Sequence, residues 1–146
     1  MMFHMTHVAR IANILGIPAG RRRLTPMNLV DEVEKGLPFS ALARVFKQVA
    51  PDEPALRYRV VPRATLARKE AKGARLSLEQ GDHVARLARV WALALEVWKE
   101  PAGARTFLLQ PHAMLDGRRP VDVALTTEGA RIVEGILGRL LYGSAA

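Results

Sequence analysis

The chain has 146 residues, a formal net charge of +8 and no cysteine, a composition that excludes disulfides and cysteine-ligated zinc. All of the excess positive charge lies in residues 1–75, which hold 14 basic against 6 acidic residues, whereas residues 76–146 hold 8 of each. A basic half favours a polyanion such as nucleic acid, and a neutral half suits protein contact.

The N-terminal segment, residues 1–26, combines an apolar stretch with the basic run "RRR" at residues 21–23. Its arginines follow the apolar part, the reverse of a secretory signal, and no apolar run in the chain reaches the roughly 18 residues of a membrane helix. We therefore expect a cytoplasmic protein without membrane contact. The arginine run is either a phosphate-binding arm or a solvated surface.

His4 and His7 are spaced to share a helical face, but no third ligand accompanies them, so we expect no metal and no cofactor.

Helical periodicity dominates the rest of the first half. Residues 27–35 predict a short helix ended by Gly36, and apolar residues recur at helical spacing in "LPFSALARVFKQV", from Phe39 to Val49. "APDEP" ends that helix. No stretch alternates apolar and polar residues as a half-buried strand would, so the expected fold class is all-α.

The stretch "PALRYRVVPRATLARKEAKGAR" predicts two short helical pieces joined around Val60 to Pro62, the spacing of a helix-turn-helix. We assign residues 27–75 to this DNA-binding region, because the first turns of the second piece could enter a major groove. Val60 stands where many such turns have glycine, and the alternative is a solvated basic helix that packs through Leu66. The candidate DNA-binding residues are Arg57, Arg63, Thr65, Arg68, Lys69 and Lys72.

Residues 76–146 form the second expected region. Ser77 and Gln80 have the spacing of a capping box at the start of a long helix, whose apolar face runs from Val84 to Trp98. "KEPAG" interrupts it, "ARTFLLQP" resumes helix briefly, and "LDGRRP" predicts a turn.

The final helix is expected to begin near Thr126, a good N-cap, and to carry a continuous apolar stripe. The stripe consists of Ile132, Val133, Ile136, Leu137, Leu140 and Leu141. Gly129, Gly135 and Gly138 each cost about 1 kcal/mol relative to alanine inside a helix, which indicates close approach by another backbone. That backbone belongs either to this chain or to a partner.

The order of these pieces resembles the antitoxins of the Xre/ParS/MbcA type. The resemblance rests on "GLPFSALARVF", "PRATLARKEAKGARLSLEQGDHVARLARVWALALEVW" and "LDGRRPVDVALTTEGARIVEGILGRLLYG". The last segment contains, in order, the family's patterns Leu-x-Gly-x-x-Pro, Thr-x-x-Gly and Leu-x-Arg-x-x-x-Gly. The chain departs from the family in having Phe107 and Leu108 where Trp-Leu is common, and Val60 in place of the turn glycine.

This resemblance implies a bacterial type II antitoxin that is not itself an enzyme. Its expected partners are a RES-like toxin that degrades NAD or transfers ADP-ribose, promoter DNA of its own operon, and further copies of itself in a homodimer or higher oligomer. In such a family the C-terminal domain would dimerise and cover the NAD cleft of the toxin. The candidate toxin-binding residues are Arg118, Arg139, Tyr142 and Gly143.

Two alternatives remain open at this point. Arg139 could satisfy the last carbonyls of its own helix while Tyr142 closes the core, and the protein could be a stand-alone DNA-binding regulator. Catalysis has little support, because "DEVE" at residues 31–34 lacks a partner motif and no phosphate-binding glycine loop or Ser/His/Asp pattern occurs.

Overall fold

The computed structural model describes residues 7–20 and 23–143. Within those ranges the chain is helical and contains no β-strand, only two isolated bridges that join Pro38 to Arg75 and His112 to Arg118. This confirms the all-α prediction. The elements are α1 (His7–Leu15), α2 (Pro26–Lys35), α3 (Phe39–Val49), η1 (Pro54–Arg59), α4 (Arg63–Ala71), α5 (Leu78–Trp98), α6 (Pro101–Leu109), η2 (Ala113–Leu115), α7 (Pro120–Val123) and α8 (Thr127–Tyr142).

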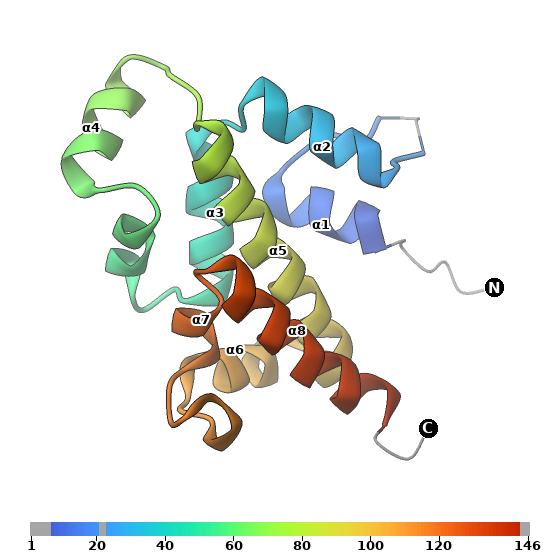
Figure 1. The fold of residues 1–146 in the computed structure, drawn as a ribbon. Coiled ribbons are helices and arrows are strands. Elements are labelled where there is room, and N and C mark those ends of the chain that lie inside the picture. The colour runs from blue at the N-terminus through green and yellow to red at the C-terminus, as the bar shows by residue number, and fades with distance from the viewer. Residues whose placement is uncertain (1–6, 21–22, 144–146) are drawn as a thin grey trace.

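Helix α5 is the central element of the molecule (Figure 1). It begins at the predicted capping box, in which the Gln80 amide donates to Ser77 Oγ at 3.2 Å and the Ser77 amide donates to Gln80 Oε1 at 3.0 Å. Helices α1, α2 and α3 contact it, as do α6 and α8. It therefore packs against elements from both expected regions, and the division of the chain at residue 76 stays a prediction.

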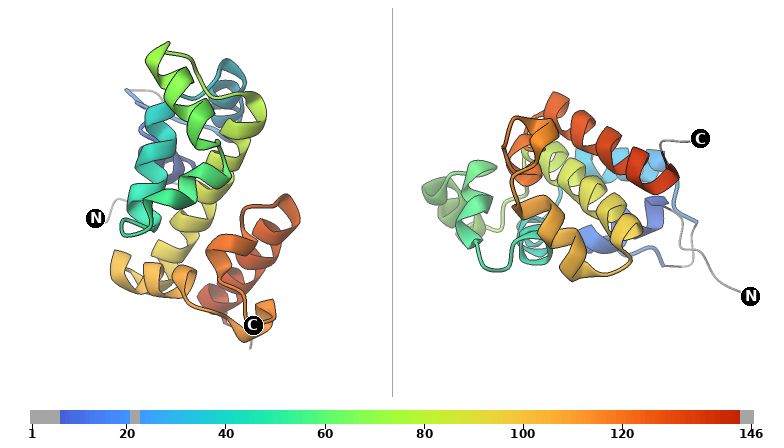
Figure 2. Two further views of the ribbon diagram at one scale, coloured as in Figure 1. Left: turned by 90° about the vertical axis from the view of Figure 1, so that its left-hand side faces the viewer. Right: turned by 90° about the horizontal axis from the view of Figure 1, so that it is seen from below.

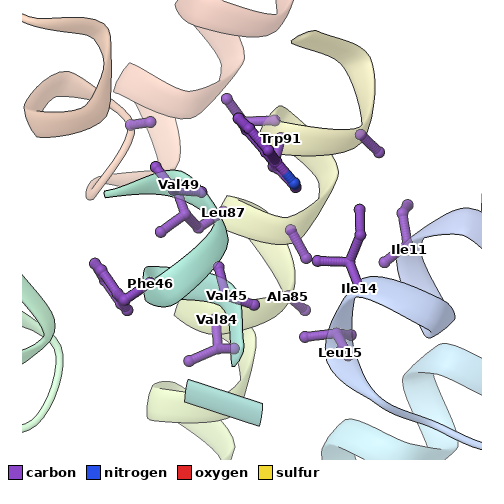
Figure 3. Close-up of a cluster of buried hydrophobic side chains, with 14 of the residues drawn as sticks. Ile11, Ile14, Leu15, Val45, Phe46, Val49, Val84, Ala85, Leu87 and Trp91 are labelled. Atoms are coloured by element: carbon purple, nitrogen blue, oxygen red, sulfur yellow. The ribbon is translucent and has the colours of Figure 1, made fainter. Parts of the chain in front are cut away.

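The core of the N-terminal half lies between α1, α3 and α5 (Figure 3). Leu15, Val45, Val84 and Trp91 are almost fully buried there. Helix α1 is part of this core, a contribution that the basic composition of residues 1–26 did not indicate. Since its apolar residues recur at helical spacing, they cover one face of α5.

The two helical pieces of the predicted helix-turn-helix are η1 and α4, and they project from one side of the molecule (Figures 1 and 2). The first helical piece is a 3-10 helix of six residues, and Pro62, in the predicted junction, is the N-cap of α4. Leu66 is the buried residue of α4, as the packing alternative expected. The chain returns to α5 through Leu76, whose amide donates to the Leu37 carbonyl at 2.8 Å.

Helix α8 lies beside α5 and α7 and starts at the predicted cap, where Thr126 Oγ1 accepts from the Gly129 amide at 2.9 Å. The predicted continuous stripe is divided: Val133, Ile136 and Leu137 are buried, whereas Ile132 and Leu140 are each 52% exposed. Ile132 is rotated by about 100° from Val133 on the helix, so α5 and α7 do not cover both. In the described residues no helix is long and apolar enough to cross a membrane.

Candidate functional site

The predicted DNA-binding side chains of α4 divide into two groups. Thr65, Arg68, Lys69 and Lys72 fall within an arc of about 100° around the helix, and each is exposed or partly exposed. Arg63 is also exposed but lies nearly opposite the centre of that arc. The structure thus places four of the six predicted residues on one open face and separates Arg63 from them.

Arg63 and Arg57 meet at the ring of Tyr58, which the sequence analysis did not select. The guanidinium carbon of Arg57 lies 5.1 Å from the ring centroid and that of Arg63 lies 4.9 Å from it. Arg57 Nη2 also donates to Tyr58 Oη at 3.1 Å. The hydrogen bond from Arg57, followed by the interaction with Arg63, lowers the pKa of the Tyr58 phenol below its usual value. Sequence could have suggested this cluster only through the aromatic residue between basic ones in "RYR".

Two other basic residues of this region are engaged elsewhere. Arg59 Nη1 contacts Asp122 Oδ1 at 2.7 Å, and Arg75 Nη1 donates to the Gly36 carbonyl at 2.9 Å. Neither was among the predicted DNA-binding residues. Of the "RRR" run, Arg23 is exposed, while Arg21 and Arg22 lie outside the described residues.

Arg119 connects the helix-turn-helix region to the segment before α8. Its Nη1 contacts Glu53 Oε2 at 2.7 Å and its Nε contacts Asp122 Oδ2 at 2.8 Å. Asp122 also accepts from Arg59, so four side chains from two distant parts of the sequence form one network. The hydrogen bond from Arg119 is the main reason that the pKa of Asp122 lies below its usual value.

The predicted toxin-binding residues lie on two elements. Arg118 is exposed on the loop between η2 and α7, whereas Arg139, Tyr142 and Gly143 lie at the end of α8. Tyr142 is 76% exposed, so it does not close the core as the alternative proposed. Gly143 has φ of 79°, a left-handed value that lets the chain turn after the helix. The backbone amide of Gly143 donates to the Arg139 carbonyl at 2.9 Å, so this carbonyl of the last turn has a backbone partner and does not need the Arg139 side chain.

The three glycines of α8 have different surroundings. A Cβ on Gly129 would lie 1.7 Å from the Val123 carbonyl oxygen, so this chain supplies the close backbone there. A Cβ on Gly135 would meet only Arg139 Nη1, at 3.8 Å, and one on Gly138 would have nothing within 4 Å among the described residues. The expected close approach is confirmed at Gly129 and is not made by the described chain at the other two.

One apolar groove lies outside both predicted surfaces. A groove of about 450 Å³ runs between α1, α2 and α5, and Val8, Leu29, Val30, Leu78 and Ala85 line its apolar part. His7 lies at its edge, and His4 lies outside the described residues. No group of three or more His, Asp or Glu side chains in the described ranges is arranged to hold a metal ion.

Two family models match consecutive parts of the chain. Residues 29–89 match the antitoxin Xre-like helix-turn-helix domain, and residues 93–143 match the antitoxin Xre/MbcA/ParS C-terminal toxin-binding domain. The chain belongs to the Xre/MbcA/ParS family of antitoxins. A relative described as "Antitoxin Xre", from Yersinia enterocolitica serotype O:8 / biotype 1B, is 28% identical over 131 residues, which cover 88% of this chain and 86% of the relative.

As an Xre/MbcA/ParS antitoxin, the protein has a regulatory rather than an enzymatic role. The matches place Tyr58 and its two arginines in the helix-turn-helix domain, and Arg118, Arg139, Tyr142 and Gly143 in the toxin-binding domain. The two matches meet within α5. The network around Arg119 therefore joins one matched domain to the other.

Proposed function

We propose that this antitoxin binds and neutralises a RES-like toxin that degrades NAD or transfers ADP-ribose from it. We further propose that it represses its own operon in the cytoplasm by binding promoter DNA, with Arg57, Arg63, Thr65, Arg68, Lys69 and Lys72 as contact residues. The observation that carries the proposal is the presence of two separate exposed surfaces, one in each matched domain.

The end of α8 supports the toxin-binding part. Arg139 and Tyr142 are both exposed, and Arg139 has no ion-pair partner among the described residues. A planar guanidinium can bind a carboxylate or a phosphate in two-point geometry, and an exposed tyrosine is a frequent anchor of protein interfaces. A stand-alone DNA-binding regulator would not need an exposed arginine and tyrosine at the end of α8.

Co-expression with the product of the adjacent reading frame tests the proposal. We expect the two proteins to purify together, the neighbour alone to consume NAD, and the complex to leave NAD intact. A mobility-shift titration should show binding to the operon's own promoter. A neighbour that neither binds this chain nor consumes NAD, together with tight promoter binding, would favour the stand-alone regulator instead.

A further inference from the structure

Tyr58 holds two cations against one aromatic ring at the entrance to α4. The guanidinium carbons of Arg57 and Arg63 lie 5.1 Å and 4.9 Å from its centroid, within the range of a cation–π contact. Its hydroxyl accepts a hydrogen bond from Arg57. Tyr58 itself is partly buried and packs against the hydrophobic core, so the ring is anchored to the body of the domain.

The two cations of this cluster have no acidic partner in direct contact within the described part of the chain. Neither Arg57 nor Arg63 forms an ion pair with any described residue, in contrast to Arg59, which contacts Asp122. Arg57 Nε is also buried without a hydrogen-bond partner in the described chain. Two like charges held close together raise the local positive potential, and that arrangement favours an anion as the third component.

The position of the cluster indicates which anion this is. Arg63 faces away from the arc that contains Arg68, Lys69 and Lys72, so it does not share their approach to base edges. Arg63 is exposed, so its guanidinium N–H groups can reach the oxygens of a phosphate, whereas Arg57 offers only the N–H groups that are neither buried nor bonded to Tyr58 Oη. Contacts to phosphates position a protein on DNA without reading its sequence.

We infer that Tyr58 is a positioning residue for DNA binding, which holds Arg57 and Arg63 together as a clamp for one backbone phosphate. This inference rests on the proposed promoter binding and adds a residue and a role to it. The clamp orders both arginine side chains before DNA arrives. Binding then loses less side-chain entropy than it would with two freely moving arginines.

Three variants separate the ring from its hydroxyl. Tyr58→Leu removes the ring and should weaken binding on the order of tenfold, because two rotamer-rich side chains must then be ordered on binding. The loss should be similar for promoter and random-sequence DNA. Tyr58→Phe keeps the ring and should stay within about twofold of the wild type. Arg59→Ala is the matched control, since this neighbouring cation does not touch the ring, and promoter affinity should change little.

A double-mutant cycle shows whether Tyr58 acts through the arginines. In an Arg57→Ala, Arg63→Ala background, Tyr58→Leu should cause no further loss of affinity, whereas an effect through general destabilisation would add to the first loss. Circular dichroism and binding of the toxin partner report whether each variant is folded.

If Tyr58→Leu is unfolded, the comparison moves to phenylalanine and pentafluorophenylalanine at position 58. These rings have nearly the same shape but opposite face electrostatics, so only the fluorinated one should lose affinity. Equal affinity of that pair, or an additive loss in the cycle, would overturn the clamp while promoter binding stands. Absence of promoter binding by the wild-type protein would overturn both the clamp and the proposed repression.

Discussion

Among single residues, those of the exposed arc of α4 form the surface that we propose for DNA recognition. Arg68 and Lys72 are exposed on it, and Thr65 and Lys69 are partly exposed. Side chains with this geometry can reach base edges or phosphates when the helix enters a major groove. The arc and the Tyr58 cluster together supply five cations to the projecting helix-turn-helix: Arg57, Arg63, Arg68, Lys69 and Lys72.

We predict that replacing Arg63, Arg68 and Lys69 together with glutamate abolishes promoter binding, because repulsion then replaces attraction to the phosphates. A mobility-shift titration measures this. The control replaces Lys35, Lys99 and Arg131, exposed cations elsewhere, with glutamate, and it should retain specific binding despite the same change in net charge. Unchanged promoter affinity of the variant at Arg63, Arg68 and Lys69 would remove the assignment of the α4 surface to DNA binding.

Lys72→Ala should weaken binding to all DNA sequences and reduce the slope of log affinity against log salt concentration by about 1.

Charge counting could predict that residues 57–75 are basic, but not what each cation contacts. Arg59 has a partner 63 positions away in Asp122, and Arg75 donates to a carbonyl 39 positions away. Such pairs depend on tertiary packing, which local spacing does not contain. The same reason explains why Gly129 was identified as a close approach while its neighbour, the Val123 carbonyl, was not.

At the scale of elements, the Arg119 network links η1 to α7. Asp122 is the shared acceptor, with Arg119 on one side and Arg59 on the other. These charges are only partly buried, so each pair contributes modestly, in the range of about 0.2–1 kcal/mol. Together they join η1 and the residue before it to the start of α7.

We predict that Asp122→Asn lowers the free energy of unfolding near neutral pH by roughly 1 kcal/mol. The pKa of Asp122 is lowered in the folded protein, so its contribution is complete above the ordinary value of 3.8 and is lost as the pH falls through the folded value. The difference between wild type and variant should therefore shrink in acid. Denaturant unfolding at several pH values measures it.

Asp116→Asn is the matched control for this experiment, because Asp116 is exposed, forms no ion pair with a described residue, and has a left-handed backbone that asparagine tolerates. Its stability should follow the wild type at every pH. A difference between wild type and Asp122→Asn that stays constant into acid would show that the charge of Asp122 is not the cause.

Helix caps and apolar periodicity predicted the elements well. Ser77 with Gln80 and Thr126 each form the bonds expected of them. Periodicity did not show that the first piece of the helix-turn-helix is a 3-10 helix, because a piece of six residues is too short to carry a pattern. It also did not show which residues of the α8 stripe stay exposed, as Ile132 and Leu140 do, because the neighbours that cover a helix depend on the assembled fold.

In the whole molecule, the two surfaces that we propose for DNA and toxin binding are far apart. The views agree that α4 and the end of α8 lie at opposite extremes of the structure (Figures 1 and 2). We therefore propose that DNA and a toxin approach the chain from opposite ends. Helix α5 supplies the rigid connection, since it contacts elements of both domains.

We predict that the chain forms at least a dimer through residues 77–143, because Ile132 and Leu140 expose apolar surface on α8. Light scattering of the full chain at tens of micromolar should give twice the monomer mass or more. Ile132→Glu with Leu140→Glu should shift it toward monomer, whereas Met27→Glu, at an exposed apolar position outside this region, should not. Monomer alone for the wild-type protein would contradict self-association.

Toxin binding through the end of α8 is tested by protection of NAD by a chain truncated after Leu141, beside the separate variant Arg139→Glu. Both remove exposed groups at the end of α8 and leave its buried residues in place. The account predicts folded protein by circular dichroism, unchanged promoter affinity, and loss of NAD protection in the presence of the toxin. Arg131→Glu, an exposed arginine on the same helix, should protect NAD normally. A truncated chain that protects NAD as well as the full chain would contradict the account.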